Sequence, residues 1–75
     1  MTTSELLIYI RDEVAKAELD NKKDAVNMYL VVKYADQLRS IAPIEFVTTI
    51  GRKESYVTEF RKGLKLAEII ADKGL

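Results

Sequence analysis

Apolar residues recur three and four positions apart along most of the chain, which is the spacing that lines one face of an α-helix. In the first segment these positions are Leu6, Leu7, Ile10, Val14 and Ala17. Thr2 precedes the segment and Glu5 follows three residues later. This pattern is typical of a capping box, in which a hydroxyl and a carboxylate each accept a hydrogen bond from a free amide. The sequence therefore predicts a helix over residues 3–18.

A second segment is apolar on most of its sides. Its main apolar positions are Met28, Val31, Ala35 and Leu38. Asp20 and Asn21, just before it, are turn-forming residues. Residues 29–32 are consecutively apolar and also fit a short buried strand, but the flanking sequence keeps the helical period. The pattern predicts a helix over residues 22–41, in the centre of a small bundle.

Proline and glycine bound a third segment, residues 43–50. Pro43 suits the first turn of a helix and disfavours helical geometry in Ala42 before it. Ser40 is a candidate cap, and Gly51 is expected to end the helix. The segment predicts a helix of about two turns, because apolar residues stand at every third position.

An apolar line continues towards the end of the chain, through Val57, Phe60, Leu64, Ala67 and Ile70. Gly63 falls within this line, so the segment is either one kinked helix or two helices. Gly74 reads as a C-cap. The chain is therefore expected to be all-α, a compact bundle of four to five helices in a single domain over residues 1–75. The side chains expected to be buried together are those of Val31, Ala35, Leu38, Val47, Val57 and Phe60.

Composition excludes several kinds of chemistry, because the chain contains neither cysteine nor histidine. Disulfides, zinc sites and every Ser-His or Cys-His nucleophile are thereby excluded. The acidic residues lack the spacing of a calcium loop or a paired-carboxylate hydrolase, and no Gly-rich phosphate loop is present. No apolar run approaches the roughly 20 residues of a membrane span. We expect a cytoplasmic protein with no enzymatic activity, no cofactor, no metal, no small-molecule substrate and no membrane contact.

Positive charge is concentrated in one part of a chain whose net charge is zero. Residues 52–65 contain five Lys or Arg residues and two acidic residues, a net charge of +3, whereas residues 1–51 contain six basic and eight acidic residues, a net charge of −2. A basic stripe on a neutral protein can face phosphate while the other faces stay indifferent. A solvated helix face is the other interpretation of the same charges.

The same region carries a recognisable corner, in the stretch TTIGRKESYVTEFRKG. Gly51 provides a residue that tolerates positive φ. Val57 and Phe60 follow it by six and nine residues, a spacing that would fix a second helix to the core and leave its outer face free. Residues 43–62 thus resemble the helix-turn-helix of repressor-type regulators of the Cro and λ-repressor kind.

Three positions depart from the pattern of that family. The residue after the glycine is normally apolar, and here it is Arg52. The next is normally a capping Ser or Thr, and here it is Lys53. The position four before the glycine is normally alanine, and here it is the bulkier Val47.

The resemblance implies that the second helix of the corner lies on double-stranded DNA. The residues it assigns to DNA binding are Lys53, Ser55, Thr58, Glu59, Arg61 and Lys62. Hydroxyl groups would bond base edges or phosphates, and the cations would add charge towards the backbone. Glu59 could accept from a cytosine amino group, but an ion pair with Lys62, three residues on, is the favoured interpretation.

Sequence-specific binding of double-stranded DNA is therefore the leading hypothesis for function. The protein would be a small transcriptional regulator, or the DNA-reading module of a mobile element or a restriction system. A homodimer is expected, because repressor-type readers place two recognition helices on a two-fold axis and so small a chain buries little surface alone. The alternative is a helical protein–protein interaction or dimerisation module, suggested by the apolar second helix and by the apolar segment LKLAEIIADKGL.

Overall fold

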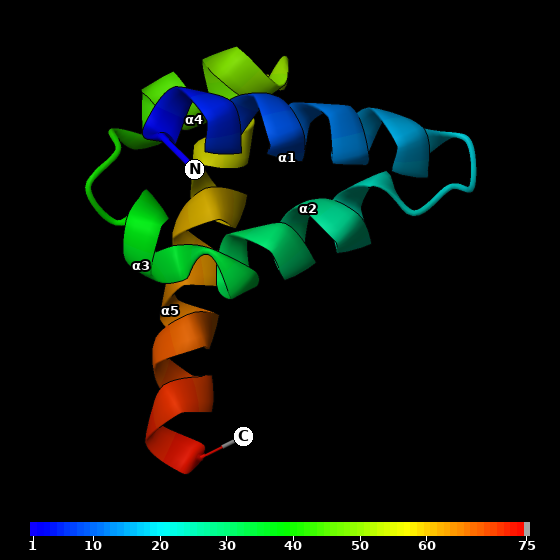
Figure 1. Cartoon of the computed structure of the whole chain (residues 1–75). Helices are drawn as coiled ribbons and strands as arrows, with labels where there is room; N and C mark the ends of the chain where they lie inside the picture. Colours follow the sequence, from blue (N-terminus) through cyan, green and yellow to red (C-terminus); the bar gives the residue numbers. More distant parts are fainter. Residues whose placement is uncertain (75) are drawn as a thin grey trace.

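Five α-helices and one 3-10 helix make up the computed structural model, which describes residues 1–74 (Figure 1). The helices are α1 (Thr3–Glu18), α2 (Lys23–Lys33), α3 (Ala35–Leu38), α4 (Pro43–Ile50) and α5 (Val57–Lys73), with η1 (Glu54–Tyr56) preceding α5. These residues contain no strand. The prediction of an all-α bundle of four to five helices is confirmed.

Local signals define the first helix. The Thr2 hydroxyl accepts the N–H of Glu5 at 3.1 Å, and the Glu5 carboxylate accepts the N–H of Thr2 at 2.9 Å, so the predicted capping box is present. The hydrogen bonds from the backbone and the side chain of Thr2 lower the pKa of Glu5. At the other end Asn21 adopts a positive φ of 57°, and the chain reverses so that α2 lies beside α1 (Figure 1).

The prediction of one helix over residues 22–41 is wrong. α2 ends at Lys33, Tyr34 leaves helical geometry at φ −107° and ψ 22°, and α3 follows as a single turn. No glycine or proline marks this break. Leu38 and Ile41, which follow it, are both buried in the core. Ser40 is not the cap of α4, since its hydroxyl donates to the carbonyl of Gln37 at 3.2 Å.

The core is built around two stacked phenylalanines from α4 and α5. The rings of Phe46 and Phe60 have centroids 4.4 Å apart and are inclined by 28°. Of the six side chains expected to be buried together, five are buried, and Val57 is half-buried against the same cluster. The buried apolar residues of the cluster are Leu6, Leu7, Ile10, Val14, Leu30, Val31, Leu38, Ile41, Phe46, Val47, Ile50 and Phe60.

Gly63 neither ends a helix nor starts one, since α5 runs through it without interruption. It is buried where α5 crosses α2. A Cβ at this position would lie 2.6 Å from Cγ1 of Val31 and 3.2 Å from Sδ of Met28. The absence of a side chain is therefore what allows the two helices to approach this closely.

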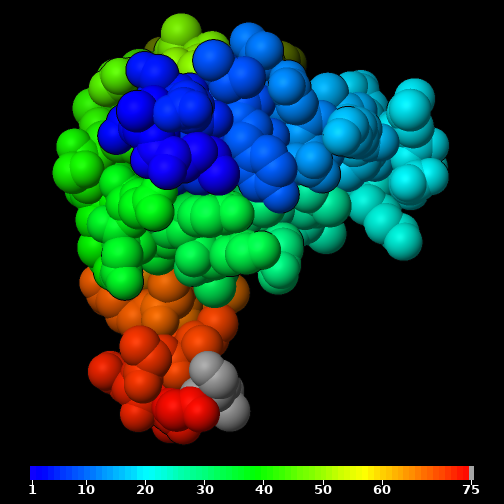
Figure 2. Space-filling model, in the orientation of Figure 1, coloured from blue at the N-terminus to red at the C-terminus, as the bar shows by residue number. Residues whose placement is uncertain are grey.

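The last turns of α5 project from the body of the molecule (Figures 1 and 2). Leu66 and Ile69 on this projection are 40% and 53% exposed. Gly74 follows in left-handed geometry at φ 71°, which confirms the predicted C-cap. Within residues 1–74, no helix is both long enough and apolar enough to cross a membrane.

Candidate nucleic-acid interface

The corner between α4 and α5 begins at Gly51, which has a φ of 85°. The N–H groups of Gly51 and Arg52 both donate to the carbonyl of Val47, at 3.1 and 2.9 Å, so the end of α4 is closed by the turn itself. No atom lies within 4 Å of a Cβ built on Gly51. Glycine is therefore favoured here by the backbone angle and not by lack of space.

The second helix of the corner is fixed by three side chains. After residues 51–53 the chain enters η1 and then α5. Phe60 is fully buried against α4, while Val57 and Tyr56 are half-buried against the same core. The anchors six and nine residues after the glycine therefore pack on the core, as the sequence predicts.

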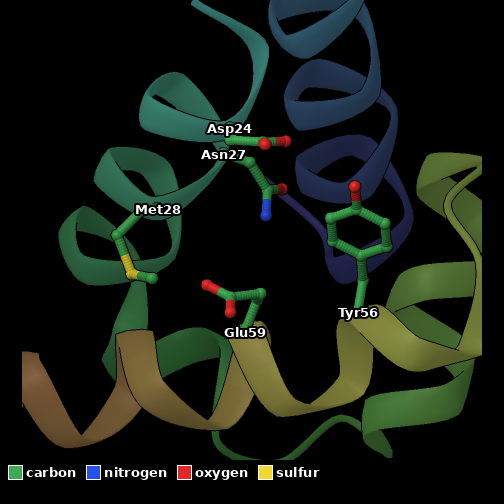
Figure 3. Close-up of a pocket in the computed structure, with 5 residues that line it drawn as sticks. All are labelled: Asp24, Asn27, Met28, Tyr56 and Glu59. Carbon is green, nitrogen blue, oxygen red and sulfur yellow. The ribbon is translucent and has the colours of Figure 1, made fainter.

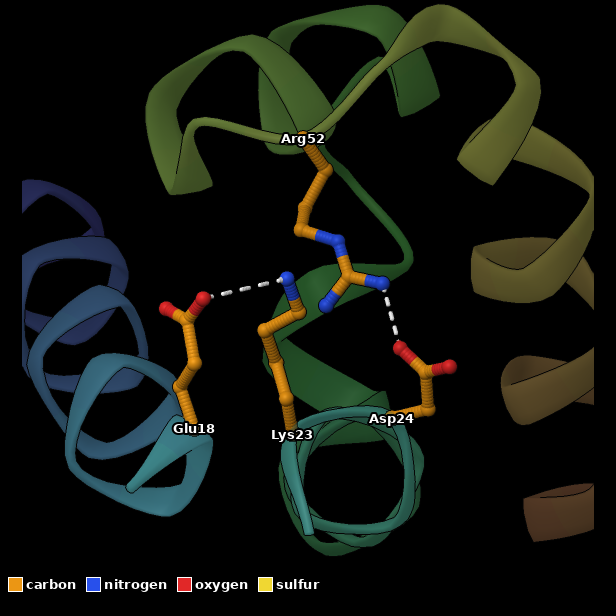
Figure 4. A network of polar contacts seen from close by, with 4 residues as sticks. All are labelled: Glu18, Lys23, Asp24 and Arg52. Carbon is orange, nitrogen blue, oxygen red and sulfur yellow. Dashed lines mark hydrogen bonds and ion pairs between the residues drawn. The ribbon is translucent and has the colours of Figure 1, made fainter. Parts of the chain in front are cut away.

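Arg52 occupies the position at which repressor-type regulators of the Cro and λ-repressor kind normally have an apolar residue. Its side chain is only 6% exposed, and its Nη2 donates to Oδ1 of Asp24 on α2 at 2.5 Å (Figure 4). The guanidinium lies 3.8 Å from the ring centroid of Tyr56, in cation–π geometry. Burial lowers the pKa of Arg52, but the interactions with Asp24 and Tyr56 outweigh it and raise this pKa above its ordinary value. Arg52 thus connects the corner to α2 while its aliphatic stem fills the apolar position.

Five of the six residues assigned to DNA binding have exposed side chains. Those with exposed side chains are Lys53, Ser55, Thr58, Arg61 and Lys62. At about 100° per residue, Thr58 and Lys62 lie on the side of α5 opposite Phe60, with Arg61 at its edge. This side is solvated because Phe60 directs the opposite side into the core.

Glu59 is placed differently from the other five. It is half-buried, and its carboxylate accepts from the Lys62 ammonium at 3.5 Å, which is the ion pair favoured from the sequence. Its side chain points towards α2, away from the outward side of α5 (Figure 3). Its direct partner in the structure is therefore Lys62.

One family model matches this chain, that of the HTH-like domain, over residues 2–73. The chain is a member of the HTH-like domain family. This membership supports a helix-turn-helix and points to DNA binding in general, by a module that is typically non-enzymatic. No curated protein and no solved structure matches the chain.

Two residues near the corner of this HTH-like domain were missed by reasoning from the sequence. Asp24, the partner of Arg52, is 28 positions away from it. Lys23, beside Asp24 at the start of α2, lies 3.8 Å from the Glu18 carboxylate and faces the corner as well (Figure 4). No local pattern connects residues so distant in sequence. Only the hairpin of α1 and α2 brings them to the turn.

A pocket of about 310 Å³ lies between α2 and α5 (Figure 3). It is lined by Asp24, Asn27, Met28, Tyr56 and Glu59. Two carboxylates make this pocket unsuited to phosphate. Among residues 1–74, no group of three Asp, Glu, His or Cys side chains could hold a metal ion. The exposed cations of the corner, Lys53, Arg61 and Lys62, lie outside the lining of this pocket.

Proposed function

We propose that this HTH-like domain binds double-stranded DNA sequence-specifically, with the outward side of α5 in the major groove. The observation that carries the proposal is the two-sided character of α5. Phe60 and Gly63 pack against the body of the protein, whereas Thr58 and Lys62 face solvent directly after a glycine turn. This is the arrangement that lets a recognition helix reach base edges while its core side stays packed.

Roles for the exposed residues follow from their chemistry. Thr58 and Ser55 carry hydroxyl groups near the start of the helix, where base edges are read. Lys53, Arg61 and Lys62 carry charge without preference for sequence, so they are assigned to the phosphate backbone. Glu59 acts through its ion pair with Lys62, by fixing the position of that ammonium.

Binding can be tested by fluorescence anisotropy on two duplexes, one selected by the wild-type protein from a random pool and one with the selected sequence scrambled. The proposal predicts tighter binding to the selected duplex and an affinity for both that falls as salt rises. Equal affinity for the two duplexes would contradict sequence-specific reading. No salt-dependent binding to either would contradict DNA binding altogether.

We further propose that the protein is a homodimer of the Cro and λ-repressor kind and acts in the cytoplasm. It would be a transcriptional regulator, or the DNA reader of a mobile element or a restriction system. Leu66 and Ile69 expose apolar surface on the projecting part of α5. A two-fold pairing through this part would place the two recognition helices at a fixed spacing, about 34 Å for one turn of DNA. The same apolar surface supports the second candidate, a protein–protein interaction module that does not bind DNA.

A further inference from the structure

A cationic recess lies at the corner, formed by segments that are far apart in the sequence. It has a volume of about 310 Å³ and is lined by Lys23, Gly51, Arg52, Lys53 and Tyr56. Three of these five residues are cations and none is acidic. The recess is therefore an electropositive concavity next to the start of η1.

Arg52, one of the residues that line the recess, has a hydrogen-bond donor that no described residue accepts. Its Nη2 is taken by Asp24, but its Nη1 is buried and has no hydrogen-bond partner among the described residues. In Figure 4 this second nitrogen points towards Lys23, away from Asp24. A buried donor on a charged group is costly to leave unpaired, more so than a neutral one. The neighbouring ammonium of Lys23 is a donor too, so it cannot satisfy Arg52.

The cations that line the recess are only partly paired with acidic residues. Asp24 pairs with Arg52, and Glu18 lies 3.8 Å from the Lys23 ammonium. Lys53 is exposed and makes no ion pair in the described part of the chain. Of the three cations that line the recess, Arg52 and Lys23 thus each have one carboxylate partner and Lys53 has none, and both partners lie outside the lining. An anion bound in the recess would accept from Arg52 and offset the repulsion between the cations.

We propose that this recess is a binding site for a phosphate-type oxyanion. Nη1 of Arg52 is buried beside the Lys23 side chain, so it would donate to the oxyanion once that flexible side chain moves aside, while Nη2 keeps its bond to Asp24. Lys23 and Lys53 complete the site from two sides as mobile point charges. Tyr56 holds the guanidinium plane by stacking at 3.8 Å.

The source of the phosphate is the backbone of duplex DNA, an assignment that rests on the proposed function. The recess lies at the turn that precedes the recognition residues. A backbone phosphate held there would fix the register of α5 along the groove, since phosphate contacts position a protein on DNA while base contacts specify the sequence. The oxyanion site itself does not depend on DNA binding and can be tested separately.

Lys23→Ala and Lys53→Ala are the informative variants, because both side chains can be removed without opening the core. Lys33→Ala is the matched control, being the same substitution at the other end of α2. Arg52→Met is a further variant that keeps an unbranched side chain on Tyr56 while removing the donors. Thermal melting establishes that each variant is folded.

The first measurement is an amide chemical-shift titration with inorganic phosphate, against sodium chloride at equal ionic strength. A specific site predicts saturable shifts at Lys23 and at residues 51–56, weakened in Lys23→Ala, Lys53→Ala and Arg52→Met and unchanged in Lys33→Ala. The second measurement is the salt dependence of affinity for duplex DNA. Losing one phosphate contact in Lys23→Ala should reduce the slope of log K against log salt by about 0.9, while Lys33→Ala keeps the wild-type slope.

The outcomes distinguish the oxyanion site from the proposed binding of DNA. Saturable phosphate shifts with a reduced slope support a site for DNA backbone phosphate. Saturable shifts without any binding of duplex by wild type support the oxyanion site, identify a free phosphate compound as its ligand and overturn the proposed function. Duplex binding with no phosphate shifts, and with the same slope in Lys23→Ala as in wild type, overturns the site and leaves the proposed function standing.

Discussion

Replacing Gly63 by alanine should destabilise this protein, although the same change in the interior of an exposed helix stabilises by about 1 kcal/mol. The added Cβ would lie 2.6 Å from Cγ1 of Val31 and 3.0 Å from its Cβ, whereas carbon atoms prefer about 3.5–4.0 Å. Val31 is fully buried and β-branched, so its side chain has no free rotamer to adopt. The helices must instead move apart by an appreciable fraction of an ångström.

The magnitude follows from two opposing contributions. Overpacking a well-filled core costs about 1–3 kcal/mol, and the improved helix propensity of alanine offsets about 1 kcal/mol of that. The closest contact is with a stiff side chain, which favours the upper half of the range. We expect a net loss of about 1–2 kcal/mol in the free energy of unfolding, measured by urea denaturation followed by circular dichroism.

The matched control is Gly63→Ala in a Val31→Ala background. Val31→Ala is itself destabilising, but it removes the Cγ1 atom that makes the closest contact with the new Cβ. The second substitution should then cost clearly less than in wild type, although the contacts with Cβ of residue 31 and Sδ of Met28 remain. The two changes should therefore be strongly non-additive. Gly51→Ala tests a glycine that is favoured by its backbone angle and not by close packing. It should cost about 1 kcal/mol through its positive φ alone, independently of Val31, because nothing lies near its Cβ. A Gly63→Ala variant more stable than wild type in both backgrounds would refute the described contact of α2 and α5.

The other predictions concern the core, the DNA-facing side, the oligomer and the first helix. Phe60→Ala should lower the free energy of unfolding by about 3–5 kcal/mol, because it removes the ring that stacks on Phe46 of α4. A melting temperature equal to that of wild type would show that α5 is not packed as described. Lys62→Ala should weaken binding to selected and scrambled duplexes alike, whereas Thr58→Ala should cost about 1–3 kcal/mol of binding free energy on the selected duplex only. If anisotropy shows the same loss for both variants on both duplexes, the assignment of Lys62 to the phosphate backbone and of Thr58 to base edges is contradicted. Ile69→Glu should convert the proposed homodimer to a monomer in sedimentation analysis, and a wild type that is monomeric at high concentration would remove the dimer from the proposal. The lowered pKa of Glu5 means that its contribution to stability is fully present above its ordinary pKa of 4.5 and is lost as the pH falls through the folded-state value. Urea denaturation of wild type and Glu5→Gln should therefore differ at neutral pH and converge in acid, and a pH-independent difference would contradict the role of the carboxylate charge.

The parts of the fold that could be predicted are those with local chemical signals. The helices over residues 3–18 and 43–50 have the predicted bounds, because a capping box marks the first and Pro43 and Gly51 mark the second. The break at Tyr34 has no such signal. Lysine, tyrosine and alanine at this point are all compatible with a helix, so only the packing of the complete bundle decides where α2 ends.

The same distinction applies to the candidate site. The outward side of α5 could be inferred because Val57 and Phe60 fix which side packs on the core. The recess could not, since Lys23 is brought to Arg52 by the α1–α2 hairpin and not by any spacing in the sequence. Gly63 stands out in the sequence because it interrupts an apolar line. Its close approach to Val31 on another helix cannot be read from the sequence.

Packing alone does not explain the positive charge at position 52. An apolar side chain would fill the space beside Tyr56, as the pattern of the resembling regulators indicates. Asp24 does not need a buried partner either, because its side chain is 75% exposed and water can solvate it. The interactions with Asp24 and Tyr56 outweigh the desolvation of the guanidinium, yet its Nη1 has no hydrogen-bond partner among the described residues. The proposed oxyanion would accept from this nitrogen and so give the charge at position 52 a role, and under the proposed function that oxyanion is a phosphate of the DNA backbone.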